Sequence, residues 1–207
     1  MMNSTAQASD PAAVLAPVWR EVLAESYRAL TTAVAGIADH QWQVPTPCSQ
    51  WTVTQVVQHA AGDQLAYAAA LGIGTGPAED PFAPSGSIAG TAADLIATAV
   101  DETAAAWATV TDDTETVPTP LPHGALPTAV AAVMCALDAG VHAWDIAIAT
   151  GQPSPLTEDL ATAFLTAATG LVEPLRQWGA YAAVLDGEPG DSAVDALLRY
   201  LGRDPRA

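Results

Sequence analysis

Three ionisable side chains have the types and the spacing of a metal-binding set. Asp138 and His142 are four residues apart, so on a helix they lie on one face with Cβ atoms about 5–6 Å apart. His59 lies far upstream in a helical pattern at 52–61, whose apolar neighbours leave a buried imidazole in need of a polar partner. If the two helices face each other, two imidazoles and a carboxylate would converge with open coordination positions, as in catalytic rather than structural zinc sites.

The main alternative to a metal site is a plain hydrogen-bonded pair. An acid and a histidine at this spacing are often no more than that. The apolar residues Val141, Trp144 and Ile148 nevertheless place the helix of Asp138 against a core, where an inward carboxylate without a partner would be strongly unfavourable. The surroundings therefore favour the ligand role, while a metal-free helical domain with hydrogen-bonded core histidines stays open as the alternative.

Two further residues are candidates for moving protons at such a site. Asp63 follows His59 by four residues and could be an extra ligand, an acceptor that orients the imidazole, or simply an exposed acid. His123 lies in a loop just ahead of the helix of Asp138 and is a better candidate for proton transfer than His40, the other loop histidine. The ordinary explanation for both loop histidines is a position on the surface.

Other residues near these candidates have structural explanations as well. Cys135 falls on the same helical stripe as the ligands and could line the site or act as a soft ligand, but a small buried packing residue is the favoured interpretation. Asp145, three residues after His142, could support that imidazole or pack the helix. Trp51 and Trp144 are more typical of core anchors than of platforms for a substrate.

The elements that would position these residues are helices. Apolar residues recur with the 3.6-residue period of amphipathic helices, and the pattern begins and ends at signals such as the Thr52–Gln55 capping box and Gly151 at a C-terminal cap. Pro174 should kink or end the last turn of its helix, because it lacks an amide proton. Two long connections, at 72–90 and 111–127, lack this period, and no stretch indicates a strand. The expected helices cover residues 14–38, 52–71, 91–110, 128–150, 157–179 and 192–201.

Four long helices joined by long connections predict an all-α fold. We expect a four-helix bundle with crossover loops and extra C-terminal helices, a fold that builds metal sites from side chains on facing helices. With 207 residues, the chain suits a single domain over 1–207 with a frayed start at 1–12.

The charge balance excludes several kinds of partner. The formal net charge is −17, and the six basic residues are all arginines. Such an acidic surface repels phosphate backbones and anionic lipid headgroups, so we expect neither nucleic acid nor a membrane as a partner. Cys48 and Cys135 are too few for a disulfide framework and are expected as reduced thiols in a cytoplasmic protein. No signal peptide, membrane span, phosphate-binding glycine loop, dinucleotide fingerprint or serine nucleophile elbow is recognisable.

Three stretches of the chain resemble a known family. They are Thr46–Val53 running on to His59, Val141–Ala147 followed by Ala149–Gln152, and the closing Leu197–Pro205. These stretches are similar to the actinobacterial family that shares its metal-binding domain with mycothiol-dependent maleylpyruvate isomerase, within the DinB-like superfamily. The resemblance spans nearly the whole chain, and the two stretches with histidines are its most specific parts.

The resemblance implies a DinB-like four-helix bundle that holds a divalent metal, typically zinc, with nickel as an alternative. Its ligands would be His59, Asp138 and His142, the set that the spacing also indicates. The family's acid is commonly Glu, so Asp138 is one methylene shorter, which could weaken or shift the metal. The isomerase's additional C-terminal domain is not expected here, so its substrate contacts do not carry over.

Two functions of different classes follow from these observations. The first is a metal-dependent transferase or isomerase that joins a low-molecular-weight thiol such as mycothiol to a small electrophile, with His123 or Asp63 moving protons. The second is a non-catalytic accessory or stress protein that binds a metal or another ligand with the same residues. The sequence identifies neither the electrophile nor the oligomeric state, and a homodimer is left open.

Overall fold

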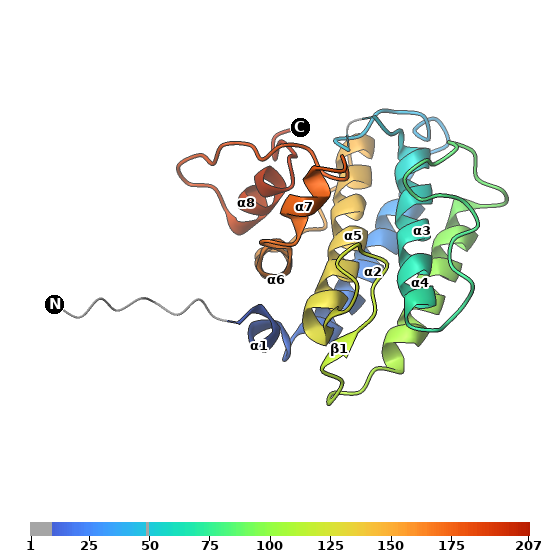
Figure 1. Ribbon diagram of the computed structural model, residues 1–207. Coiled ribbons are helices and arrows are strands. Elements are labelled where there is room, and N and C mark those ends of the chain that lie inside the picture. The colour runs from blue at the N-terminus through green and yellow to red at the C-terminus, as the bar shows by residue number, and fades with distance from the viewer. Residues whose placement is uncertain (1–9, 49) are drawn as a thin grey trace.

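The computed structural model describes residues 10–48 and 50–207, and helices make up most of this part of the chain (Figure 1). The expected frayed start falls largely on residues 1–9, which lie outside the described residues. The helices are α1 (Pro11–Leu15), α2 (Trp19–Ala35), α3 (Val53–Ala70), α4 (Ala92–Ala108), α5 (Thr128–Thr150), α6 (Glu158–Ala168), α7 (Val172–Arg176) and α8 (Ala193–Tyr200), and the strands are β1 (Thr116–Val117) and β2 (Leu126–Pro127).

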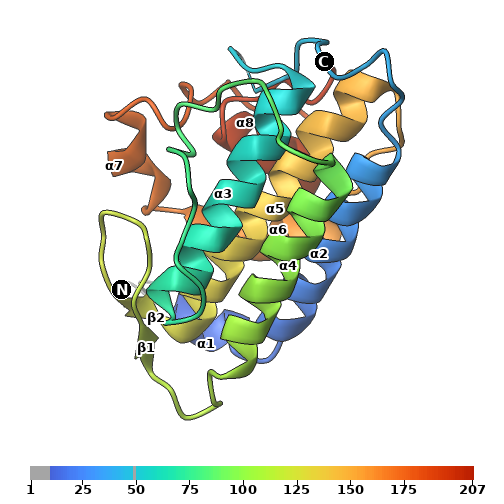
Figure 2. The same cartoon turned by 90° about the vertical axis from the view of Figure 1, so that its right-hand side faces the viewer.

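Helices α2, α3, α4 and α5 form a four-helix bundle. Contacts run from α2 to α5, from α5 to α3, from α3 to α4 and from α4 back to α2, so the four helices close a ring. Figure 2 shows that α3 and α4 run in the same direction, because the long connection 71–91 returns along the outside of the bundle before α4 begins. The all-α DinB-like bundle with a crossover connection is therefore confirmed.

Helix α5 is the centre of the fold. By length and composition it could cross a membrane, but 94% of its most apolar segment is buried inside the protein, which identifies a core helix. It contacts α2 and α3 on one side and α6 on the other. It ends at Gly151, which takes the left-handed conformation (φ 73°) that favours glycine. A side chain on α5 can therefore meet residues of the bundle and of the C-terminal helices.

The crossover connection is fastened to α3. Helix α3 starts at the predicted capping box, in which the Gln55 side chain accepts a hydrogen bond from the Thr52 amide. Gln55 also donates to the carbonyl of Pro84, and Gln58 accepts from the amide of Gly86 at 2.7 Å. These contacts satisfy polar backbone groups of the connection and hold the connection against the helix that carries His59.

Two predicted helices are each broken in the structure. The helix expected at 14–38 is replaced by α1 and α2, because Pro17 in a continuous helix would clash with the carbonyl of Ala13. The helix expected at 157–179 is replaced by α6 and α7. Gly170 adopts φ 85° between them, and Pro174 lies in the first turn of α7, where a missing amide proton costs nothing. The expectation of one helix over 157–179, kinked or ended at Pro174, was therefore wrong.

The connection between α4 and α5 contains a small antiparallel pairing that the sequence did not indicate. Thr116 pairs with Pro127, and Val117 pairs with Leu126. Each strand has only two residues, which is too short to show an alternating pattern.

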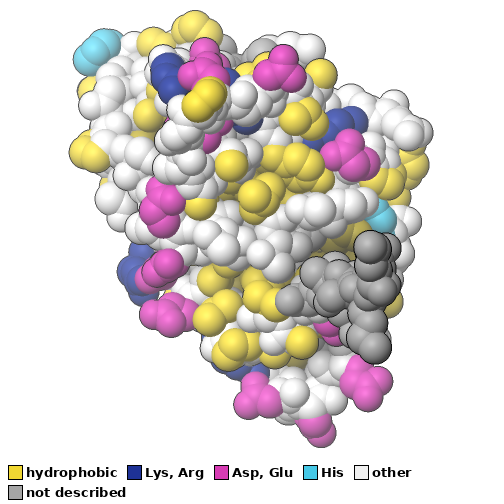
Figure 3. Space-filling view, turned by 90° about the vertical axis from the view of Figure 1, so that its left-hand side faces the viewer, with side chains coloured by type: hydrophobic (Ala, Val, Ile, Leu, Met, Phe, Trp, Pro, Cys, Tyr) yellow, Lys and Arg dark blue, Asp and Glu magenta, His cyan; other side chains and the backbone are white. Residues whose placement is uncertain are grey.

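Helices α6 and α8 pack together and form a layer on α5 opposite α3 and α4 (Figure 1). Figure 3 shows the face on this side of the molecule, where acidic side chains stand apart from one another between small apolar areas. The chain ends near the C-terminal end of α5, which brings the last residues close to the part of the bundle that holds His142.

Candidate metal centre

The three predicted ligands meet between α3 and α5. The Oδ1 atom of Asp138 lies 3.4 Å from Nε2 of His59 and 3.4 Å from Nε2 of His142. The two imidazole centres are 4.7 Å apart, and the rings are nearly perpendicular. Only 7–11% of each of these side chains is exposed. Two imidazole nitrogens and one carboxylate oxygen thus converge in a largely water-excluded position.

Each imidazole is held in place through its other ring nitrogen. Nδ1–H of His59 donates to the carbonyl of Pro81 at 2.9 Å, and Nδ1–H of His142 donates to Oδ2 of Asp145 at 3.0 Å. A proton fixed at Nδ1 leaves the lone pair of a neutral ring at Nε2. Both lone pairs then point toward Asp138, as in histidines that ligate a metal and are oriented by a second hydrogen bond.

The two Nε2 lone pairs and the Asp138 carboxylate oxygen are all hydrogen-bond acceptors, so they require a positive charge between them. Burial alone would lower the pKa of His59, but Asp138 and Asp63 outweigh it and raise that pKa to about 9. Burial lowers the pKa of His142 despite the neighbouring carboxylates, whereas the two histidines hold the pKa of Asp138 below its usual range. In the metal-free protein a proton on His59 therefore supplies the charge that a divalent cation would supply.

Asp63 lies beside this set, one helical turn after His59. Its Oδ2 is 4.0 Å from Nε2 of His59. Burial and the negative charge of Asp138 raise the pKa of Asp63 to about 7. Such a carboxyl group exchanges its proton near neutral pH, which a proton-transfer residue requires.

A buried amide supports Asp138 from the other side. Gln64 donates from Nε2 to Oδ2 of Asp138 at 3.3 Å and to the carbonyl of Cys135 at 3.1 Å. The Cys135 thiol in turn donates to Oε1 of Gln64 and lies 3.8 Å from the Tyr27 hydroxyl. Cys135 is fully buried in the core, which fits the packing role that its position on α5 suggested.

The support of His142 extends to the end of the chain. Arg203 donates from Nε to Oδ1 of Asp145 at 2.9 Å and from Nη2 to Oδ2 at 2.7 Å. Burial would raise the pKa of Asp145, but Arg203 and His142 bring it down to about 2. Asp145 therefore stays ionised and supports the imidazole, one of the two roles that its position suggested.

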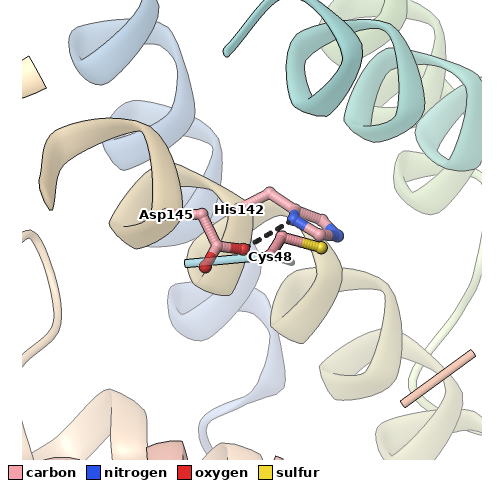
Figure 4. A group of neighbouring side chains, drawn as sticks. All are labelled: Cys48, His142 and Asp145. Carbon is pink, nitrogen blue, oxygen red and sulfur yellow. Dashed lines mark hydrogen bonds and ion pairs between the residues drawn. The ribbon is translucent and has the colours of Figure 1, made fainter. Parts of the chain in front are cut away.

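A second group of possible ligand atoms shares His142. Ligand atoms of Cys48, His142 and Asp145 lie within 4.8 Å of one another, and Figure 4 shows the Cys48 side chain beside the imidazole. Both oxygens of Asp145 are already bound by Arg203, and burial together with Asp145 raises the pKa of the Cys48 thiol to about 11. This group lacks a free carboxylate and a thiolate, so it is a poorer cation site than the set around Asp138.

Aromatic side chains form the walls around His59. The rings of Trp51 and Phe82 have their centres 4.6 Å and 5.4 Å from the imidazole. Trp51 also packs against the core, whereas Phe82 is 61% exposed. Trp144 is buried in the core, as expected.

The remaining candidates, His123 and His40, belong to neither group of converging ligand atoms. His123 is in the connection between β1 and β2. Within the described residues, neither of its ring nitrogens has a hydrogen-bond partner. Its role in proton transfer stays a prediction. His40 is exposed, in keeping with a surface histidine.

Sequence reasoning missed three contributors to the site. The Pro81 carbonyl has no sequence signal, because every residue carries a carbonyl group. Gln64 had no spacing signal, because a residue five positions after His59 lies on a different face of the helix. Arg203 had one signal, which is a cation placed directly after a glycine at the expected end of the last helix.

The fold and this geometry define a helical-bundle protein with a site suited to a divalent metal. The sequence profile of the mycothiol maleylpyruvate isomerase N-terminal domain matches residues 23–147. The chain belongs to this family of DinB-like metal-binding domains. It is also 32% identical, over 183 residues, to the uncharacterized proteins MT0763 and Rv0738 from two strains of Mycobacterium tuberculosis, with 86% of this chain and 93% of each relative covered. No solved structure gives a significant match.

Proposed function

We propose that this protein binds one divalent ion, with zinc favoured over nickel, through His59, Asp138 and His142. The observation that carries this proposal is the convergence of two Nε2 atoms on one carboxylate oxygen, at 3.4 Å each, with both Nδ1 atoms already engaged. The set offers two neutral nitrogens and one negative charge, which suits zinc and leaves room for a further ligand.

We further propose that the protein is a transferase or isomerase that uses a thiol such as mycothiol. A bound divalent ion would lower the pKa of a thiol that reaches it. The chain's own residues would do the rest. His59 and His142, with their rings fixed, would hold the ion to which the thiol binds. Asp63, with a pKa near 7 in the metal-free protein, would accept the proton that the thiol releases.

The surroundings of the site suit a small co-substrate. Trp51 and Phe82 supply apolar surface beside His59, and the exposed Phe82 lies on the connection that covers α3. We propose a small electrophile as the second substrate and a cytoplasmic location, where low-molecular-weight thiols are reduced. The net charge of −17 supports a role without nucleic acid or membrane partners.

Metal analysis tests the first part of the proposal. Protein purified without chelator should contain about one divalent ion per chain, and His142→Ala should lose it. The exposed His40→Ala variant is the matched control and should keep the ion. Wild-type protein that remains metal-free after incubation with zinc and dialysis would refute the metal site.

Thiol chemistry tests the second part. Zinc-loaded protein should consume a model electrophile only when mycothiol is present, and His59→Ala should abolish this activity while the helical content stays unchanged. Asp63→Asn should retain zinc and lower the turnover number, since it removes only the proton acceptor.

One observation favours a non-catalytic alternative. The ligand side chains are only 7–11% exposed, so an ion there would have little access to bulky reactants. In that case zinc-loaded protein would bind a small thiol saturably, and no electrophile in a broad panel would be consumed.

A further inference from the structure

The last turn of α8 directs a cation into the core. The amide of Gly202 donates to the carbonyl of Arg199 at 3.0 Å, and the amide of Arg203 donates to the carbonyl of Leu198 at 2.8 Å. This pair of bonds, with Gly202 at φ 80°, is a Schellman motif. A Cβ atom on Gly202 would lie 2.8 Å from the carbonyl oxygen of Ala183. The turn therefore requires glycine, and it sends the next side chain inward.

We propose that Arg203 is a positioning residue of the metal centre and acts through Asp145 on His142. The inference rests on the proposed metal site and extends it to a residue well beyond the stretch 23–147 that matches the family. Arg203 touches none of the three ligands in the contacts described. Its two hydrogen bonds, at 2.9 Å and 2.7 Å, both go to the carboxylate that holds His142.

The geometry explains how this works. A guanidinium fork that binds both oxygens fixes the plane of a carboxylate as well as its position. Oδ2 of Asp145 then faces Nδ1 of His142 in a single orientation. Side-chain exposure is 0% for Asp145 and 8% for Arg203, so water cannot replace either partner. The ring of His142 keeps its Nδ1–H tautomer and points Nε2 at the ion position.

A merely structural salt bridge is the competing explanation, and α8 supplies its matched control. Arg199 lies one turn before Arg203 and is buried to the same extent, at 7% and 8% exposure. It pairs with Glu188 at 2.9 Å and Asp191 at 3.0 Å, and neither acid touches the metal site. Arg199→Met and Arg203→Met therefore each remove a largely buried, ion-paired cation, but only the second removal reaches His142.

Metal affinity separates the two explanations. Zinc affinity is measured by competition with a chromophoric chelator for the wild type and for Arg203→Met, Asp145→Asn, their double variant and Arg199→Met. Arg203→Met and Asp145→Asn should each weaken binding about 10–100-fold, and Arg199→Met should stay within about 2-fold. The double variant should be no weaker than the worse single variant, because both changes break one chain of contacts.

A second readout needs no metal. Nitrogen-15 spectra of the metal-free protein should show His142 as a single Nδ1–H tautomer in the wild type and as a mixture in Arg203→Met. If Arg203→Met does not fold, Arg203→Lys keeps the charge without the fork and should show the same tautomer mixing.

The outcomes distinguish this inference from the proposed function. Wild-type zinc binding with Arg203→Met and Arg199→Met equally affected, or both unaffected, would overturn the positioning role and leave the metal site intact. A wild type that binds no zinc would refute the metal site, and the tautomer of His142 in Arg203→Met would still decide whether Arg203 positions the ring.

Discussion

The two imidazoles of the site are held by different means. His59 depends on a neutral backbone carbonyl, that of Pro81, in a long connection fastened to α3 by glutamine side chains. His142 depends on a charged carboxylate that is locked by Arg203 from the C-terminal layer. His59 is therefore held by a loop, whereas His142 is tied through Asp145 to Arg203, just after α8, which packs on α6.

The two histidines also differ in protonation. The pKa of His59 is raised to about 9, and the pKa of His142 is lowered. In the metal-free protein His59 is the charged ring and His142 the neutral one, although both face Asp138 at 3.4 Å. The metal must displace a proton on the His59 side, whereas the nitrogen on the His142 side is already free.

Removing the ligand that the two halves share should have the largest effect. Asp138→Ala takes away the only negative ligand, and we expect zinc affinity to fall at least about 1,000-fold, measured by chelator competition. Asp138→Glu should retain one ion per chain, because it keeps the carboxylate and lengthens it by one methylene. Retention of tight zinc binding by Asp138→Ala would show that the ion is held elsewhere.

The pH dependence should distinguish the two rings. The pKa of His59 is 6.5 in its ordinary state and about 9 in the metal-free fold, so the folded state binds this proton more tightly. Its contribution to stability is complete below pH 6.5 and is lost as the pH rises through 9. The free energy of unfolding should fall by at most about 3 kcal/mol over this window, as measured by urea titration of the metal-free protein.

The control for this pH dependence is His59→Gln, whose stability should change much less between pH 6.5 and 9. Zinc binding should show the opposite trend and tighten as the pH rises, because the ion competes with the His59 proton. Equal slopes for the wild type and His59→Gln would contradict the assignment of the charged ring.

The convergence of the three candidate ligands was predictable because their sequence signals are local. Asp138 and His142 share one face of a strongly periodic helix. His59 lies seven residues after Thr52, which begins a recognisable capping box. The helix breaks were harder. Pro17 and Pro174 are compatible with either the first turn of a new helix or the interior of a kinked one, and only tertiary packing decides between these.

The groups that hold the ligands were not predictable in the same way. Arg203 is 58 residues from Asp145, and their pairing depends on how α8 packs beyond α6. Pro81 contributes a backbone atom from a connection with no periodic pattern. Sequence spacing therefore indicates the side chains that could bind an ion, while the geometry that fixes them comes from tertiary contacts.

Two helical glycines offer a milder way to disturb one half at a time. A Cβ atom on Gly140 would lie 2.8 Å from the buried ring of Phe164, and one on Gly62 would lie 2.9 Å from the ring of Pro81. Gly140→Ala should cost about 1–3 kcal/mol of stability by overpacking α5 against α6, partly offset by better helix propensity. Gly62→Ala should cost less stability, because the connection can move.

For metal affinity the expected order is reversed, and Gly62→Ala should lose more than Gly140→Ala. Displacing Pro81 loosens the hydrogen bond to His59, so Gly62→Ala should weaken zinc binding about 3–10-fold. Thermal unfolding and chelator competition on both variants check the pair. If Gly62→Ala loses stability without losing affinity, the Pro81 carbonyl does not position the ring.

The smallest effect is expected at Cys48, on the far side of the His142 ring. Its thiol belongs to the second group of possible ligand atoms, but Arg203 occupies both oxygens of Asp145, and the raised thiol pKa opposes a thiolate. Cys48→Ser should keep one zinc per chain with affinity within about 3-fold of the wild type, and the cobalt-loaded wild type should show no thiolate-to-metal absorption band. A cobalt spectrum that loses such a band on substitution would place sulfur on the ion. In that case the ion pair between Asp145 and Arg203 would have to break when the metal binds. His142 would then be the less firmly held of the two rings.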